Sequence, residues 1–169
     1  MPAEPVEALI QSYTSARDLF EAAREAARDA ERISRAVERM RSREQLRAQG
    51  YQPRTSGGGR ADPNAATDAR VDYERRVARR READLALMSY ASSVCYGDGA
   101  YAGGVASLLT PAHADALWWR YVNAATWPET AEGTGMSERW CRDAVAVALD
   151  QVDAYGFGRV RSGLGLAEA

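Results

Sequence analysis

The sequence of 169 residues contains no lysine, a single histidine and only two cysteines. One imidazole, His113, leaves no second histidine for a metal cluster or a catalytic pair. Cys95 and Cys141 have no CxxC partner and lie in apolar surroundings, so we expect two buried, reduced thiols. We therefore expect no catalytic residues, no metal and no cofactor, and a protein that is not an enzyme.

Long apolar runs are also missing. No stretch approaches the ~20 apolar residues that a membrane-spanning helix needs, and the N-terminus lacks the basic-then-apolar order of a signal peptide. We expect a cytoplasmic protein with no membrane partner. The formal charge of −2 gives no overall attraction to nucleic acid. No segment alternates as a strand does, and 46% of the residues are hydrophobic, so the composition predicts a folded, all-α protein.

Residues 5–49 are predicted to form one long helix, because no glycine or proline follows Pro5 within them. Apolar residues recur at spacings of three and four, as in a coiled-coil seam. The seam consists of Val6, Leu9, Tyr13, Ala16, Phe20, Ala23, Ala27, Ala30, Ile33, Val37 and Met40. This helix would be longer than any partner over residues 63–96. We therefore expect Leu9, Tyr13 and Phe20 to be left uncovered and to form a homodimer through the N-terminal helix.

A loop rich in glycine and proline follows at residues 50–63, and it predicts a flexible turn between two helices. It contains neither GxxxxGKS/T nor GxGxxG, so nothing marks it as a phosphate site. Asp62 and Pro63 should cap a second helix that runs to about Tyr96. Residues 5–96 would then form a long, coiled-coil-like helical hairpin.

The second helix carries a cluster of arginines that includes Arg75, Arg76, Arg79 and Arg80. Two interpretations are open. The cluster can be a solvated face that nearby acids offset, or a basic patch that supplements contacts to DNA.

Residues 105–155 are predicted to form a small helical domain, followed by a flexible tail at 156–169. Within it, the segment Thr126–Val152 is typical of two helices joined by a tight turn, the arrangement that places a helix in the DNA major groove. Thr126 and Glu129 have the spacing of a capping box. Gly135 allows a left-handed turn, and Ser137 can cap the next helix.

The second helix of this segment should bury one apolar face, made of Met136, Cys141, Ala144, Ala148, Leu149 and Val152. Its other side carries the candidate DNA-binding residues Ser137, Glu138, Arg139, Arg142 and Asp143. We assign Arg139 to a guanine and Arg142 to a neighbouring base or phosphate. Glu138 can accept from a cytosine amine, Asp143 can pair with Arg139 at i,i+4, and Ser137 can lie near a phosphate.

The sequence GMSERWCRDAVAVALDQV resembles the recognition-helix signature of sigma-factor region 4, and LWWRYVNAATWPETAEGTGMS resembles the phage late-transcription activator family. In that family a Leu…Arg-Tyr helix, a short turn and a tryptophan precede the first helix of the motif, as Leu117, Arg120, Tyr121 and Trp127 do here. The resemblance covers roughly residues 110–153. It implies a DNA-binding transcription regulator of phage or prophage type, with double-stranded DNA and RNA polymerase as partners.

The chain departs from this family at Thr130, Gly133 and Thr134, where larger or more helix-favouring residues are usual. These smaller residues predict that the first helix of the motif packs less tightly than in the family.

Two other functions stay open. One is a phage DNA-packaging adaptor similar to small terminase subunits, which also combine a helix-turn-helix with an oligomerising helical hairpin. The other is a protein-interaction module that does not bind DNA. Residues 111–169 contain five arginines and eight acids, a local charge of −3. Specific DNA-binding proteins usually present a basic face, so this charge favours the interaction module.

Overall fold

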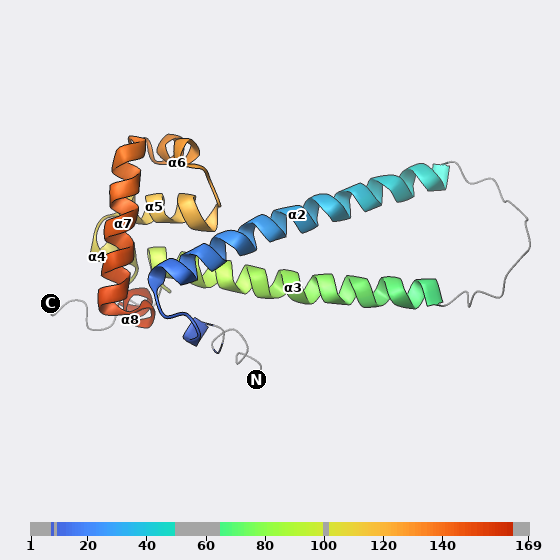
Figure 1. The fold of residues 1–169 in the computed structure, drawn as a ribbon, viewed down its shortest axis with the longest axis horizontal. Coiled ribbons are helices and arrows are strands. Elements are labelled where there is room, and N and C mark those ends of the chain that lie inside the picture. Colours follow the sequence, from blue (N-terminus) through green and yellow to red (C-terminus); the bar gives the residue numbers. More distant parts are fainter. Residues whose placement is uncertain (1–7, 9, 50–64, 100–101, 164–169) are drawn as a thin grey trace, which may run out of the picture.

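A computed structural model describes residue 8 and residues 10–49, 65–99 and 102–163. Every regular element in these ranges is a helix, which confirms the all-α prediction. Two long helices, α2 (Ala16–Gln49) and α3 (Ala65–Tyr96), form a hairpin that projects from a cluster of short helices (Figure 1). The cluster comprises α4 (Val105–Leu108), α5 (Pro111–Leu117), the π-helix η1 (Trp118–Val122), α6 (Trp127–Thr134), α7 (Glu138–Tyr155) and α8 (Phe157–Ser162).

Helix α2 begins at Ala16, so the predicted continuous helix over residues 5–49 is wrong. The chain leaves the helical conformation over residues 12–15, which contain two serines and a threonine. Hydroxyl side chains compete for backbone hydrogen bonds and favour helix starts over helix interiors. Ser15 illustrates this, because its hydroxyl accepts a hydrogen bond from the Asp18 N–H at 3.1 Å.

Two of the three residues whose predicted exposure was the basis for expecting a homodimer, Tyr13 and Phe20, are covered within the chain. Phe20 is fully buried within the chain, and Tyr13 is half-buried against the same core. Helices α2 and α3 have nearly equal lengths of 34 and 32 residues. Val6 and Leu9 lie outside the described residues.

A carboxylate from α7 caps the start of α2. The Ala16 N–H donates a hydrogen bond to Asp153 Oδ1, across 137 residues of sequence. The first N–H groups of a helix have no partner within the helix, and a carboxylate there also interacts favourably with the helix dipole. Asp153 therefore fixes the base of the hairpin to α7.

We expect Asp153→Ala to lower the free energy of unfolding by about 0.5–2 kcal/mol, the usual cost of removing a helix cap. The matched control is Asp150→Ala, because Asp150 is exposed one turn earlier on α7 and also loses one negative charge. Urea unfolding followed by circular dichroism measures both. Equal midpoints for the two variants would contradict the capping role.

The base of the hairpin and the short helices share one hydrophobic core. The rings of Phe20 in α2 and Tyr121 in η1 lie 5.7 Å apart, and Val94 and Cys95 of α3 are fully buried beside Leu117. The small C-terminal domain predicted at residues 105–155 is thus completed by the hairpin, which supplies part of its core.

The predicted apolar seam of α2 is buried only in its first half. Ala16, Phe20 and Ala23 are buried, whereas Ile33 and Val37 are half-buried and Met40 is 45% exposed. Leu19, Ala26 and Asp29, which are not part of the predicted seam, are also buried. The seam residues Ala27 and Ala30 are only half-buried. On α3 the pattern is the same, since Leu87, Ala91 and Val94 near its end are buried while Val71, Tyr73 and Leu85 are exposed.

An ion pair marks the limit of the closely packed part of the hairpin. Asp29, only 7% exposed, forms ion pairs with Arg80 of α3 and with Arg32 of its own helix. Beyond this point the two helices diverge toward their far ends (Figure 1). The predicted loop at residues 50–63, with the expected cap at Asp62 and Pro63, lies outside the described residues. The predicted end of the second long helix at Tyr96 is confirmed, while the described part of α2 stops at Gln49.

The segment predicted as a flexible tail instead contains α8. Val160 is fully buried, and its carbonyl accepts a hydrogen bond from the Gly104 N–H at 2.6 Å. The Asp98 N–H donates to the Arg161 carbonyl at 3.2 Å. The prediction of a flexible tail is therefore wrong for residues 157–162, while residues 164–169 lie outside the described part. Among the described helices, none is long and apolar enough to cross a membrane.

Candidate nucleic-acid interface

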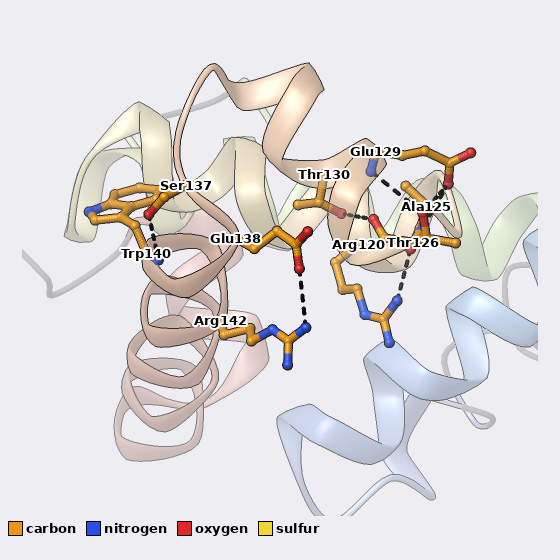
Figure 2. Close-up of polar contacts among 9 residues, drawn as sticks. All are labelled: Arg120, Ala125, Thr126, Glu129, Thr130, Ser137, Glu138, Trp140 and Arg142. Atoms are coloured by element: carbon orange, nitrogen blue, oxygen red, sulfur yellow. Dashed lines mark hydrogen bonds and ion pairs between the residues drawn. The ribbon is translucent and has the colours of Figure 1, made fainter.

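Helix α6 begins with the predicted capping box (Figure 2). The Thr126 N–H donates to Glu129 Oε2 at 2.7 Å, and the Glu129 N–H donates to Thr126 Oγ1 at 3.5 Å. Each residue thus satisfies a backbone group that the helix leaves unpaired. The hydrogen bond from the Thr126 backbone holds the pKa of the Glu129 carboxyl below its usual value. The capping box is therefore weakened when falling pH protonates this carboxylate.

The turn after α6 also has the predicted form. Gly135 ends α6 with φ 69° and ψ 17°, in the left-handed region that glycine enters without steric cost. Ser137 then begins α7, and its hydroxyl accepts a hydrogen bond from the Trp140 N–H at 3.2 Å (Figure 2). Two helices joined by a tight turn are confirmed at the predicted residues.

Helix α7 buries the predicted face with one exception. Cys141, Ala144, Ala148, Leu149 and Val152 are buried, and Val145 joins them. Met136 is instead 42% exposed, because it precedes the helix and does not follow its periodicity. The prediction that both cysteines are buried is confirmed. Burial raises the pKa of the Cys95 thiol, which favours its protonated form.

Helix α6 packs closely against its neighbours. Thr130 is fully buried, and its hydroxyl donates to the Thr126 carbonyl at 2.8 Å. Gly133 lies directly against the Trp119 indole, where an added Cβ would come within 2.4 Å of Trp119 Cε2. The small residues therefore make room for a large ring from η1, which compensates for the missing side-chain volume.

A π-helical turn joins α5 to the loop before α6. The Asn123 N–H donates to the Trp118 carbonyl at 3.0 Å, five residues back, and the Ala125 N–H donates to the Trp119 carbonyl at 3.0 Å. Ala124 has a φ of 52°, which is unusual for a residue with a side chain. This backbone path brings the Ala125 carbonyl to Arg120, whose Nη1 donates to it at 2.9 Å (Figure 2).

Two arginines make cation–π contacts with the Trp127 ring. The guanidinium carbon of Arg120 lies 4.4 Å from the ring centre and that of Arg142 lies 5.2 Å from it. Arg142 Nη2 also lies 3.3 Å from Glu138 Oε2. Figure 2 shows the Arg142 side chain extending from α7 toward Arg120. We call Arg120, Trp127, Glu138 and Arg142 the Trp127 cluster.

The two arginines of the Trp127 cluster differ in exposure. Arg120 is half-buried, and its Nε is buried without a hydrogen-bond partner among the described residues. Burial lowers the pKa of Arg120 accordingly. The Arg142 side chain is 56% exposed, so it can meet a partner while the cation–π contact and Glu138 restrict its orientation. In the sequence, Arg120 and Trp127 are only points of resemblance to the phage late-transcription activator family, and no sequence pattern predicts a role at the site for either.

The five predicted contact residues lie together on the exposed side of the first two turns of α7. Ser137, Glu138, Arg139, Arg142 and Asp143 are all exposed. The predicted pair of Asp143 with Arg139 does not form within the described chain, and the i,i+4 pair that forms joins Glu138 to Arg142. The Arg142 guanidinium lies over the Trp127 ring on the same side as Glu138. Arg139 is exposed and has no ion pair among the described residues.

The arginine cluster on α3 lies elsewhere. Arg75, Arg76 and Arg79 are exposed, but Arg80 is engaged by the buried Asp29. These residues belong to the N-terminal half of α3, in the part of the hairpin that projects away from α7 (Figure 1). The structure therefore does not bring them to the first turns of α7. One member of the predicted patch, Arg80, instead joins α3 to α2 through its ion pair with Asp29.

His113 connects the start of α5 to the start of α7. Its Nδ1 lies 2.8 Å from Thr110 Oγ1, and its ring packs edge-on against Trp140 at 5.3 Å. Within the described residues, no three His, Cys, Asp or Glu side chains are grouped so that they could hold a metal ion. The arrangement at α7 is thus one of exposed guanidinium, hydroxyl and carboxylate groups on a rigid support, which suits recognition of a polar surface.

Comparisons with known proteins found no matching family model, curated protein or solved structure.

Proposed function

We propose that α6 and α7 form a helix-turn-helix that places the first turns of α7 in the major groove of duplex DNA. The protein would then act as a transcriptional regulator of phage type, with RNA polymerase as a further partner. The observation that carries this proposal is the set of capping and turn features that begin and end α6 and begin α7. The capping box, the left-handed Gly135 and the Ser137 cap leave five polar residues exposed around the start of a well-supported helix.

Each exposed group has a matching contact on DNA. Arg139 can reach a guanine through its two-pronged guanidinium. Arg142 is oriented by Trp127 and Glu138, and this fixed geometry suits a phosphate or a base next to that guanine. Ser137 and the free N–H groups of the first turn can bind a phosphate, and Glu138 can accept from a cytosine amine.

The test begins with selection of binding sites from random duplex DNA by the purified full-length chain. Fluorescence anisotropy on the selected duplex then compares Arg139→Ala with Arg159→Ala. Arg159 is an exposed arginine in α8, at the opposite end of α7 from Arg139 (Figure 1), so both variants lose one positive charge. We expect Arg139→Ala to bind about tenfold more weakly and to lose preference at one base pair, since such contacts contribute about 1–3 kcal/mol.

Arg159→Ala should bind within about twofold of the unaltered chain, because a remote charge acts only through a screened field. A wild-type protein that binds no duplex even at low salt would exclude the proposal. Equal losses for both variants would show that charge alone, and not the position on α7, determines binding.

A second candidate is a protein-interaction module that uses the later exposed side of α7. Beyond its first two turns the exposed side of α7 carries Asp150 and Val147, which is 44% exposed, and no arginine. An acidic and apolar surface is repelled by phosphates and suits a protein partner. This candidate predicts no DNA binding at low salt and therefore gives the opposite result in the same experiment.

A further inference from the structure

The outer half of the hairpin contains an apolar groove between α2 and α3. Its volume is about 540 Å³, and it lies beyond the Asp29–Arg80 ion pair. Apolar side chains of both helices line it, with two arginines among the lining residues. We call this the hairpin groove; it is lined by Ile33, Val37, Met40 and Arg41 of α2 and by Tyr73, Glu74, Val77, Ala78 and Arg81 of α3.

The lining of the hairpin groove has the spacing of buried helix faces but is not buried. Ile33, Val37 and Met40 follow one face of α2 at i, i+4 and i+7, and Tyr73 and Val77 do so on α3 at i and i+4. Met40 is nevertheless 45% exposed and Tyr73 is 52% exposed. The helices diverge here, so neither covers the other. Apolar surface of this kind, bordered by charged residues, is typical of an interaction site.

The charge around the groove differs from that of the rest of the chain. Residues 29–43 and 71–82, which include Asp29 and its two arginine partners, together contain ten arginines and six acids, a formal charge of +4, whereas the whole chain carries −2. Several of these arginines are exposed on both helices, including Arg41 and Arg81 beside the groove. A partner must therefore offer an apolar stripe and a negative charge together.

We propose that the hairpin groove binds an acidic amphipathic helix of another protein. Such a helix can lay its apolar stripe along Val37, Met40 and Val77 and direct its carboxylates to Arg41 and Arg81. A second copy of this hairpin would bring a charge of +4 against another +4, which disfavours self-association through this surface. A DNA duplex would match the charge but would leave the apolar floor without a partner. This inference rests on the hairpin alone and does not depend on α7.

The experiment uses the full-length chain and synthetic, fluorescently labelled helical peptides. One set has leucine or isoleucine at i, i+3, i+4 and i+7 and glutamate at the surface positions. The control set keeps the apolar positions and replaces each glutamate by lysine. We expect the glutamate peptides to bind at least about tenfold more tightly than the lysine peptides, with an affinity that falls as salt rises.

Matched variants of the protein locate the site. Tyr73→Ala and Arg81→Glu change residues that line the groove, whereas Leu85→Ala and Arg75→Glu change exposed residues of α3 outside its lining. We expect the first two to weaken binding of the glutamate peptides at least about fivefold, and the second two to leave it within about twofold. All four residues are exposed, so each variant should retain the helical circular dichroism of the unaltered chain.

Three results would overturn the proposal. The first is that no glutamate peptide binds, or that glutamate and lysine peptides bind equally. The second is that unlabelled duplex DNA displaces the peptide and Arg75→Glu weakens binding as much as Arg81→Glu, which would assign the surface to nucleic acid. The third is a dimer in light scattering that Tyr73→Ala dissociates, which would assign the groove to a second copy.

Discussion

Gly104→Ala should lower the free energy of unfolding by about 2–6 kcal/mol, from backbone strain and a steric clash together. Gly104 has φ 87° and ψ 165°, a backbone region that is essentially limited to glycine and costs other residues about 1–3 kcal/mol. A Cβ at this position would also lie 2.4 Å from the Gly97 nitrogen and 2.5 Å from the Tyr96 carbonyl carbon. Backbone atoms cannot move aside as a flexible side chain can, so the clash adds about 1–3 kcal/mol.

The matched control is Gly99→Ala. Gly99 lies in the same loop and has a φ of 84°, but an added Cβ would meet nothing within 4 Å. It should therefore cost only the backbone strain, about 1–2 kcal/mol. Urea unfolding gives both values, and limited proteolysis reports whether α8 detaches, because the Gly104 N–H holds the Val160 carbonyl. Similar destabilisation by both changes would mean that the glycine-rich loop does not pack as described.

Gly133→Ala should also destabilise the protein, by up to about 2 kcal/mol, although helix propensity alone predicts the reverse. Alanine is favoured over glycine by about 1 kcal/mol inside a helix, and Gly133 lies inside α6. The added Cβ would come within 2.4–2.8 Å of three ring atoms of Trp119. The rigid indole must shift away from α6, and overpacking of this kind costs more than the propensity returns.

Gly158→Ala is the control for this second prediction. Gly158 lies inside α8, and an added Cβ there would meet nothing within 4 Å. Helix propensity is the only effect that we expect at this position, so the free energy of unfolding should rise by about 0.5–1 kcal/mol. The two variants should therefore shift the thermal midpoint in opposite directions. A stabilising Gly133→Ala would refute the contact between Trp119 and α6.

Local features of the fold were predictable from residues that are close in sequence. The capping box needs only Thr126 and Glu129, three positions apart, and the start of α7 needs only Ser137 and the N–H of Trp140. Gly135 adopts the left-handed conformation that its missing side chain allows. Helix caps and glycine turns are stabilised by hydrogen bonds and steric limits within one turn, so no distant partner is required.

The candidate site was only partly predictable for the same reason. The exposure of Ser137, Glu138 and Arg139 follows from the position of α7 and its apolar face. The orientation of Arg142 does not, because it depends on Trp127, which the left-handed Ala124 and the π-helical η1 bring to α7. Position 124 is an alanine, so neither glycine nor asparagine marks that left-handed residue in the sequence.

The sequence by itself determined that the described chain is helical, where α6 begins and ends, where α7 begins, and which residues lie exposed at the start of α7. Only the tertiary structure decided that the Asp153 carboxylate caps α2 at Ala16, and that α8 packs into the core. It also decided that the seam of the hairpin stays open beyond Asp29. Helix caps join residues within one turn, whereas burial and long-range pairing depend on residues such as Ala16 and Asp153, which lie 137 positions apart. Periodicity identifies an apolar face, but the distance to the opposite helix determines whether that face is covered.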